Sequence, residues 1–348
     1  MPQKMKVLIT SPSRDREEAY QEIEEAGFSL IRGRSYEQFR DRPYTEDELI
    51  MLCKDVDAIF ASSRDRLTRR VLETAEQLQL VVFHTTGVDR IDVDAATELG
   101  ILVCNSPSVE NMIGMAEATI SLMLALIKRL KHNENILRQG RWGRGEDRGD
   151  LLYGKTVGII GLGRIGRTVA HRLGPWGVRF LAYDPYVDRK RVQELGVTLV
   201  DLDTLVQEAD FVLVLVVITS ETRNLLAERE LRMMKPTAFI INTARGEAIN
   251  EDALVHAIQE GWIAGAALDA FWQEPLPLES PLRQLDPERV ILTPHKIGQS
   301  EIGSRANNLL AVESLLKGLR GDIPEHAVNP EAVPRWKERL SRLHTSRL

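Results

Sequence analysis

The stretch that decides the fold is Thr156–Asp184, TVGIIGLGRIGRTVAHRLGPWGVRFLAYD. It begins with an apolar run, 157–160, that has the length of a buried strand. Three glycines with G-x-G-x-x-G spacing come next: Gly161, Gly163 and Gly166. A helical repeat of apolar residues then runs to Leu173, and a second apolar strand ends at Asp184. Strand, glycine turn, helix and strand together predict one βαβ unit.

The glycine spacing indicates a dinucleotide site because its surroundings match. Gly161 permits a tight turn, Gly163 lets the backbone approach a pyrophosphate, and Gly166 allows close helix–strand packing. The helix N-terminus offers free N–H groups to that pyrophosphate. Asp184 can accept hydrogen bonds from ribose hydroxyls and would repel a 2′-phosphate, so NAD is favoured over NADP. The alternative is a purely structural βαβ unit.

Bulk properties limit the class of protein. With 348 residues, the chain is expected to form two domains, because single cores stop growing at about 250–300 residues. The net charge of −6 argues against binding to nucleic acid or an anionic membrane. No apolar run reaches the ~20 residues of a membrane span. Cys53 and Cys104 stand among apolar neighbours, as in a reducing compartment, and the seven histidines do not cluster, so we expect no metal site.

Strands alternate with helices along the chain, which predicts parallel sheets covered by helices on both faces. The first half has predicted strands at 6–10, 58–61, 80–83 and 101–104, and the second half at 157–160, 180–183, 211–217, 238–242, 264–268 and 290–292. The segment 111–130 is apolar on all sides of a helix, so we expect it to be buried between domains or subunits. The basic segment 334–348 is expected to dock as a helix or to fray.

Three residues with catalytic chemistry follow three strands of the second half: Arg245, Glu274 and His295. Residues after parallel strands meet at one edge of the sheet, where ligands of such folds bind. A histidine can protonate the oxygen of a ketone as hydride adds to the carbon. A carboxylate can orient the ring and stabilise the imidazolium, and an arginine can hold a carboxylate with two parallel hydrogen bonds. Taken singly, each of the three could be structural.

At this point the chain resembles the NAD-dependent D-isomer-specific 2-hydroxyacid dehydrogenases, a family that includes D-3-phosphoglycerate dehydrogenase and glyoxylate/hydroxypyruvate reductase. The resemblance covers roughly residues 58–319. Its marks are HTTGVDRIDVDAA, NSP, MAEATISLMLAL, GLGRIG, YDP, NTARG, ALDAF–EP and TPH.

The resemblance implies an α/β fold of two domains, in which a Rossmann-type doubly wound parallel sheet is inserted in a flavodoxin-like substrate-binding domain. The expected boundaries are 1–106 plus 298–330 for the outer domain, 107–297 for the NAD-binding domain and 331–348 for a C-terminal tail. The implied activity is hydride transfer between NAD(H) and a 2-hydroxy acid/2-keto acid pair, specific for the D isomer, in a cytoplasmic homodimer that binds no nucleic acid or membrane.

The resemblance also assigns residues. Arg245, Glu274 and His295 correspond to the catalytic set, with His295 as proton donor and acceptor. The positions implied to contact the cofactor are Gly161, Gly163, Arg164, Ile165, Gly166, Asp184, Thr243, Ala244 and Asp269. The backbone of Thr85, Thr86 and Gly87, together with Arg245, is implied to receive the substrate carboxylate. Some relatives with this fold act instead as NADH-sensing binding proteins of the co-repressor type, which keep the same catalytic set.

Some positions depart from the family pattern or keep two interpretations. The 105–117 stretch is one residue longer than usual, with Gly114 where serine is common, and Ser62 stands where phosphoglycerate-specific relatives have arginine. His84 is either pocket-lining or structural. Trp142 and Trp272 are interpreted as residues that pack the domain or a dimer contact, the alternative being closure over substrate. The side chains of Arg14, Arg16, Arg64 and Arg66 are interpreted as solvated charges, the alternative being a substrate clamp.

Overall fold

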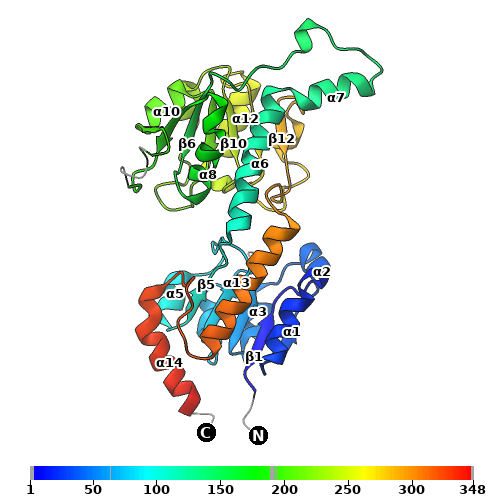
Figure 1. The fold of residues 1–348 in the computed structure, drawn as a ribbon. Helices are drawn as coiled ribbons and strands as arrows, with labels where there is room; N and C mark the ends of the chain where they lie inside the picture. The colour runs from blue at the N-terminus through cyan, green and yellow to red at the C-terminus, as the bar shows by residue number, and fades with distance from the viewer. Residues whose placement is uncertain (1–3, 63, 189–191, 193, 346–348) are drawn as a thin grey trace. The chain divides into compact units, whose positions relative to one another are not determined.

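The computed structural model describes residues 4–62, 64–188, 192 and 194–345. It divides into two compact units, each with its own parallel sheet. Unit 1 comprises Met1–Asn111 and Ser300–Leu348, and unit 2 comprises Met112–Gln299. Because unit 2 is inserted in unit 1, both ends of the chain belong to unit 1, whose ribbon is therefore blue to cyan and orange to red in Figure 1.

Unit 1 contains a five-stranded sheet in its described residues, in the order β2-β1-β3-β4-β5. Its strands are β1 (Lys6–Ile9), β2 (Ser29–Arg32), β3 (Ala58–Ala61), β4 (Leu80–Phe83) and β5 (Leu102–Cys104). Every neighbouring pair is parallel. This is the flavodoxin-like strand order, so the predicted fold of the outer unit is confirmed.

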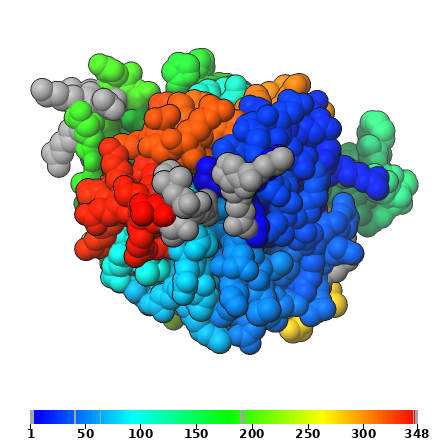
Figure 2. All heavy atoms as spheres, turned by 90° about the horizontal axis from the view of Figure 1, so that it is seen from below, coloured from blue at the N-terminus to red at the C-terminus, as the bar shows by residue number. Residues whose placement is uncertain are grey.

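Helices cover both faces of this sheet. Its helices are α1 (Glu17–Glu25), α2 (Tyr36–Asp41), α3 (Glu46–Cys53), α4 (Arg69–Thr74), α5 (Val93–Glu98), α13 (Glu301–Leu319) and α14 (Val333–Thr345), with short 3₁₀ turns η1 (Arg14–Arg16) and η6 (Pro330–Ala332). Residues of α1, α13 and α14 pack on one face of the sheet, and residues of α3, α4 and α5 on the other. Figure 2 shows α13, in orange, beside the blue N-terminal part, in agreement with the contacts between α13 and α1.

The segment 331–348, which was predicted to be a C-terminal tail, belongs to unit 1. Trp336 of α14 is fully buried, and Leu340 packs in the same core cluster as the strands. The Arg339 guanidinium donates to the carbonyls of Ala75, Glu76, Leu78 and Leu99. These hydrogen bonds join α14 to the chain that follows α4 and α5. The apolar face of α14 docks on the sheet of unit 1 because it buries Trp336 and Leu340 there.

Unit 2 contains a seven-stranded parallel sheet in its described residues, in the order β12-β11-β10-β9-β6-β7-β8. Its strands are β6 (Thr156–Ile160), β7 (Arg179–Tyr183), β8 (Val197–Leu199), β9 (Phe211–Val214), β10 (Phe239–Asn242), β11 (Gly265–Leu268) and β12 (Val290–Leu292). Counted from β6, this is the doubly wound dinucleotide-binding order with one added edge strand. The predicted Rossmann-type fold is confirmed, although β8 was missed and β9 ends three residues earlier than predicted.

Helices again lie on both faces. They are α6 (Val109–Ile127), α7 (Leu130–Arg138), α8 (Arg164–Leu173), α10 (Leu202–Glu208), α11 (Glu228–Met233) and α12 (Glu251–Gln259), with 3₁₀ turns η2 (Gly145–Asp147), η3 (Gly174–Trp176), η4 (Gly246–Ala248) and η5 (Pro281–Gln284). Residues of α6 and α8 share one core cluster with the sheet, and residues of α10, α11 and α12 share the other. Among the described residues, α6 alone has the length and apolar composition to cross a membrane, a test that a core helix of a soluble protein also passes.

Both cysteines are free and buried, and burial raises the pKa of each thiol to about 12. They act as small apolar residues of the core of unit 1.

Candidate active site

The glycine turn after β6 has the geometry that a pyrophosphate needs. Gly161 has φ +92°, and a Cβ on it would lie 2.8 Å from the Leu215 carbonyl oxygen. A Cβ on Gly166 would lie 2.5 Å from the Gly161 oxygen, so α8 can begin this close to β6 only with glycine there. Gly163, by contrast, faces open space at the N-terminus of α8, where backbone N–H groups point outward. The turn therefore fits the phosphates of a dinucleotide.

Asp184 follows β7 directly and holds this turn in shape. One carboxylate oxygen accepts a hydrogen bond from the Leu162 N–H at 2.9 Å, and the other accepts from the Tyr186 N–H at 2.9 Å. Each oxygen has a second lone pair that can accept from a ribose hydroxyl. Arg164 is exposed and Ile165 half-buried, both in the first turn of α8 beside the phosphate position.

His295 and Glu274 are brought together by the structure. Each Glu274 carboxylate oxygen lies 2.8 Å from Nδ1 of His295. Because a carboxylate only accepts, Nδ1 carries a hydrogen, and Nε2 is the atom that can exchange a proton with a substrate. Burial opposes ionisation of Glu274, but the hydrogen bond and charge of His295 outweigh it and lower the pKa of the carboxyl group. The histidine side chain keeps 37% of its surface exposed, so the ring is accessible.

The turn that carries His295 is held by Asp269. One oxygen of this buried carboxylate accepts from the Thr293 hydroxyl at 2.6 Å and from the N–H groups of Lys296 and Ile297 at 3.0 and 3.3 Å. His295 has φ +54°, a left-handed conformation that costs a non-glycine residue about 1–2 kcal/mol. The three hydrogen bonds, on both sides of His295, hold the backbone in that conformation. Burial raises the pKa of Asp269.

Arg245 lies after β10, near Glu274. Its positive charge is among the causes that lower the pKa of the Glu274 carboxyl group. Asn242 fixes the turn, because its amide donates to the Arg245 carbonyl at 2.8 Å and accepts from the Ala244 N–H at 3.0 Å. Thr243 is predicted beside the cofactor, and its hydroxyl is buried 2.9 Å from the Thr119 hydroxyl of α6. The Thr243 hydroxyl is therefore engaged within the protein.

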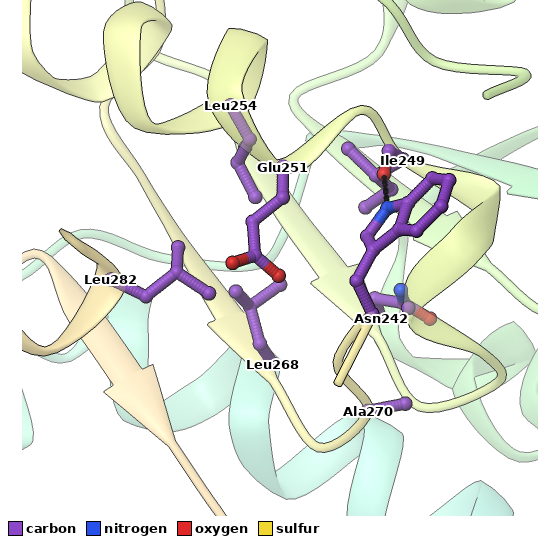
Figure 3. A pocket seen from close by; sticks show the side chains of 9 residues that line it. Asn242, Ile249, Glu251, Leu254, Leu268, Ala270 and Leu282 are labelled. Carbon is purple, nitrogen blue, oxygen red and sulfur yellow. Dashed lines mark hydrogen bonds between the residues drawn. The ribbon is translucent and has the colours of Figure 1, made fainter. Parts of the chain in front are cut away.

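A close packing contact connects Arg245 with the segment that carries Glu274. A Cβ on Gly246 would lie 2.0 Å from the carbonyl carbon of Phe271. The Trp272 indole donates to the Ile249 carbonyl at 2.7 Å, the contact dashed in Figure 3. Figure 3 also shows the Glu251 carboxyl group directed among Leu254, Leu268 and Leu282. Burial there raises the pKa of Glu251, although a hydrogen bond from the backbone N–H of Trp272 acts in the opposite direction. Asn242 and Gly246 stand in the NTARG motif and Thr293 stands in the TPH motif, but the sequence analysis gave them no role. Glu251 was not singled out at all.

In unit 1, the loop after β4 contains unpaired backbone donors. Among the described residues, the N–H groups of Thr85, Thr86 and Gly87 donate to no protein acceptor, whereas the carbonyls of Thr85 and Thr86 accept from the Ser106 N–H and the Asn105 amide. The Thr85 hydroxyl donates to the Gly87 carbonyl at 3.2 Å, which curves the loop. Consecutive outward N–H groups in such a turn form an anion-binding concavity.

The tryptophans and arginines for which the sequence left two interpretations differ in their exposure to solvent. Trp272 packs and is hydrogen-bonded, whereas Trp142 is 86% exposed, so it does not pack in the domain and a dimer contact stays a prediction for it. Arg14, Arg64 and Arg66 are exposed, whereas Arg16 is half-buried.

Within the described part of the chain, no group of three His, Cys, Asp or Glu side chains could hold a metal ion.

Comparisons with known proteins agree with this geometry. Residues 120–296 match the model of the D-isomer specific 2-hydroxyacid dehydrogenase NAD binding domain. The chain is 39% identical over 341 residues to D-3-phosphoglycerate dehydrogenase of Methanocaldococcus jannaschii, covering 97% of this chain and 62% of that protein. It is 39% identical over 319 residues to glyoxylate reductase of Korarchaeum cryptofilum, covering 90% of this chain and 95% of that protein.

The chain belongs to the D-isomer-specific 2-hydroxyacid dehydrogenase family. A solved structure of D-lactate dehydrogenase from Aquifex aeolicus, complexed with NAD and lactic acid, superposes with a TM-score of 0.83 at 29% identity, covering 92% of this chain and 98% of that chain. Members of the family are NAD-dependent oxidoreductases that interconvert 2-hydroxy and 2-keto acids, and unit 2 carries the family's NAD-binding domain. The chain spans less than two thirds of the phosphoglycerate dehydrogenase relative.

Proposed function

We propose that this protein transfers a hydride between NAD(H) and a 2-hydroxy acid/2-keto acid pair, with specificity for the D isomer. The observation that supports it most strongly is the Glu274–His295 pair, which lies after two strands of the dinucleotide-binding sheet. NADH, when bound, supplies the hydride. The chain's own residues orient the acid and supply the proton.

His295 is the proposed proton donor in reduction and the proton acceptor in oxidation. As hydride adds to the carbonyl carbon, negative charge develops on the oxygen, and Nε2 donates its proton to that atom. Glu274, at 2.8 Å from Nδ1, orients the ring and compensates the positive charge of the imidazolium. Arg245 offers a planar pair of donors to the substrate carboxylate and carbonyl.

Unit 1 is the proposed substrate-binding unit. Its N–H groups at Thr85, Thr86 and Gly87, which have no protein acceptor among the described residues, are suited to the substrate carboxylate. Consecutive backbone N–H groups can bind an anion without a positively charged side chain. In unit 2, the proposed cofactor contacts are the glycine turn with Arg164 and Ile165 for the pyrophosphate, Asp184 for the ribose, and Thr243, Ala244 and Asp269 for the nicotinamide end. The proposed substrate-binding domain comprises residues 1–106 and 298–330 together with the docked helix α14, and the proposed NAD-binding domain comprises residues 107–297.

A homodimer in the cytoplasm is proposed, with no nucleic-acid or membrane partner. Five large apolar side chains between residues 130 and 153 are more than half exposed: Leu130, Leu137, Trp142, Leu151 and Tyr153. Several exposed large apolar side chains on one segment favour an interface between subunits. The negative net charge supports neither a polyanion nor an anionic lipid as the partner.

The first experiment is turnover with NADH and, in parallel, NADPH against glyoxylate, hydroxypyruvate, phosphohydroxypyruvate, pyruvate and bulkier 2-keto acids. We expect NADH-dependent reduction of at least one acid, with a rate that falls as pH rises, because His295 must be protonated; oxidation should show the opposite dependence. His295→Asn should reduce the rate on the order of 10²–10⁴-fold while NADH still binds. NADH binding without turnover on any acid would contradict the proposal and favour the NADH-sensing binding protein.

A further inference from the structure

The turn that carries Glu274 is held by a second carboxylate, that of Glu251. Glu251 is the first residue of α12, and its carboxylate accepts a hydrogen bond from the backbone N–H of Trp272. The indole N–H of Trp272 donates to the carbonyl of Ile249 at 2.7 Å, two residues before Glu251. Both N–H groups of Trp272 are therefore bound by the short segment that leads into α12.

The peptide that joins Phe271 to Trp272 is fixed at both of its ends. Its N–H is the group that Glu251 binds, and its carbonyl packs so closely on Gly246 that a Cβ there would lie 2.0 Å from the carbonyl carbon. This peptide begins the turn that ends in Glu274, since the Phe271 N–H donates to Oε1 of Glu274 at 3.1 Å. The position of the Glu274 carboxylate therefore depends on the orientation of this peptide.

The surroundings of Glu251 are unfavourable for a carboxylate. Figure 3 shows its carboxyl group directed among three leucines, Leu254, Leu268 and Leu282. Among the described residues that line this pocket, Glu251 alone is charged. Burial raises the pKa of Glu251, the hydrogen bond from Trp272 lowers it, and the charge of the neighbouring Asp252 raises it. A carboxylate placed among apolar side chains costs free energy unless it is hydrogen-bonded, so the Trp272 N–H gives this glutamate a physical reason.

We propose that Glu251 is a positioning residue for the pair of Glu274 and His295. Its carboxylate holds the peptide that joins Phe271 to Trp272, and this peptide sets where the Glu274 carboxylate lies. The inference rests on the proposed function, because it concerns the support of the proposed acid–base group. Without the acceptor, the peptide can rotate, and the Glu274 carboxylate compensates an imidazolium less well. The glycine turn proposed to bind NADH follows a different strand, β6, and is not affected.

The test compares wild type with Glu251→Leu, Glu251→Gln and the matched control Asp252→Asn, which removes one negative charge from the exposed next position in the first turn of α12. Leucine suits the apolar surroundings but accepts no hydrogen bond, whereas glutamine keeps an acceptor oxygen. With the 2-keto acid that wild type reduces fastest, Glu251→Leu should lower kcat on the order of 10–100-fold, with KM and NADH affinity unchanged. Glu251→Gln should keep most of kcat and Asp252→Asn all of it. The melting temperature of Glu251→Leu should fall no further than that of Asp252→Asn.

The pH dependence of kcat separates positioning from a general loss of structure. Reduction slows as pH rises because His295 must be protonated, and a displaced Glu274 carboxylate stabilises the imidazolium less. In Glu251→Leu the fall should therefore begin at a lower pH, by up to about one unit. The other charged groups that act on the pair are Asp269, through His295, and Arg245, through Glu274. These variants change neither, and Asp252→Asn should keep the wild-type profile.

Three outcomes would overturn the inference while wild type still turns over and Glu274→Gln is still impaired. Glu251→Leu could keep the wild-type kcat and pH profile. Its kcat, NADH affinity and melting temperature could all fall together, which would make Glu251 structural only. Glu251→Gln could lose as much kcat as Glu251→Leu, which would exclude the hydrogen bond as the cause. Silence of the wild type on every acid would instead refute the proposed function, and the inference with it.

Discussion

At the scale of single residues, three histidines of this chain have different surroundings. His295 has a carboxylate on Nδ1 and an exposed edge. His84 has a guanidinium on Nε2 and is buried, and both lower its pKa and favour the neutral ring. His132 lies between the carboxylates of Asp147 and Glu288. Of the three, only His295 combines a charge-compensating partner with a ring that a ligand can reach, and this supports it as the acid–base group.

Glu274→Gln tests the support given to His295. The glutamine keeps the volume but cannot compensate an imidazolium, so reduction should slow on the order of 10²-fold with NADH affinity unchanged. The pKa of Glu274 is lowered from its usual 4.5, so its support is present at neutral pH and is lost only as pH falls through that lowered value. Initial rates and NADH titrations measure both quantities. A variant as active as wild type would remove Glu274 from the mechanism.

Gly246→Ala tests the packing that places Arg245 near Glu274. The added Cβ would overlap the backbone of Phe271 and Trp272, so the segment that carries Glu274 must move. We expect a loss of about 1–3 kcal/mol in stability and a larger loss of turnover than of NADH binding. Thermal melting, NADH titration and kcat separate these effects. Gly163→Ala, where the Cβ meets open space, is the structural control, and its melting temperature should stay at the wild-type value.

The sequence indicated the candidate catalytic residues, but it did not indicate the contacts that hold them in position. Arg245, Glu274 and His295 follow strands, and strand ends can be located from apolar runs. The contacts of Arg16 with His84 and of Gly246 with Phe271 join residues far apart in the chain. They depend on how loops from different strands pack, which no local pattern encodes. Arg16 was accordingly grouped with the solvated arginines, and that interpretation is wrong for this residue.

At the scale of elements, the strands missed by the sequence analysis are β2 and β8. Both are edge strands, at the first position of one sheet and the last position of the other. β2 has no fully buried residue, and β8 has only three residues. An edge strand is covered on fewer sides and needs a weaker apolar run, so its sequence resembles a loop.

The helix α7 is held to two other segments through His132. One ring nitrogen is 2.7 Å from Asp147 in η2, and the other contacts Glu288 in the turn before β12. The hydrogen bonds to Asp147 and then to Glu288 raise the pKa of His132 above its usual 6.5. This bridge joins the exposed arm of residues 130–153 to the body of unit 2.

His132→Gln should therefore destabilise the protein in a pH-dependent way. A histidine with a raised pKa stabilises the fold fully below its unfolded value and loses this contribution as pH rises through the folded value. The difference in melting temperature between wild type and variant should be largest in mild acid and should vanish in alkaline buffer. His256→Gln is the control, since His256 contacts Trp262 and no carboxylate among its described contacts. A difference that grows with pH would contradict the assignment.

At the scale of the whole molecule, the two sheets have different strand orders that follow from the same rule. Each is parallel with helices on both faces, and each places its candidate residues after the carboxyl ends of strands. The alternation of strands and helices was sufficient to predict this class. The surface was harder to predict, since the exposure of Trp142 and Leu137 depends on an arm, α7 and the loop after it, whose proposed partner is a second subunit.

Leu137→Asp tests whether this arm joins two subunits. A charge in the centre of an apolar interface is strongly unfavourable, so the variant should be a monomer at concentrations where wild type is a dimer. Light scattering after size-exclusion chromatography measures the mass. Leu278→Asp, at a side chain that is 87% exposed elsewhere in unit 2, is the matched control and should stay dimeric. Wild-type mass for the Leu137 variant would mean that the arm is not the interface.

The insertion of unit 2 has a further consequence. The chain enters it at Met112 and leaves it at Gln299, and these ends are neighbours, since a Cβ on Gly114 would lie 2.5 Å from the Gly298 carbonyl oxygen. A serine at position 114 would separate the two passages, which gives the departure from the family pattern a physical reason. A segment whose ends adjoin can be exchanged as one piece without stretching its host. Nature, or a protein engineer, could therefore replace the whole nucleotide unit by recombination at two points while the outer unit keeps its fold.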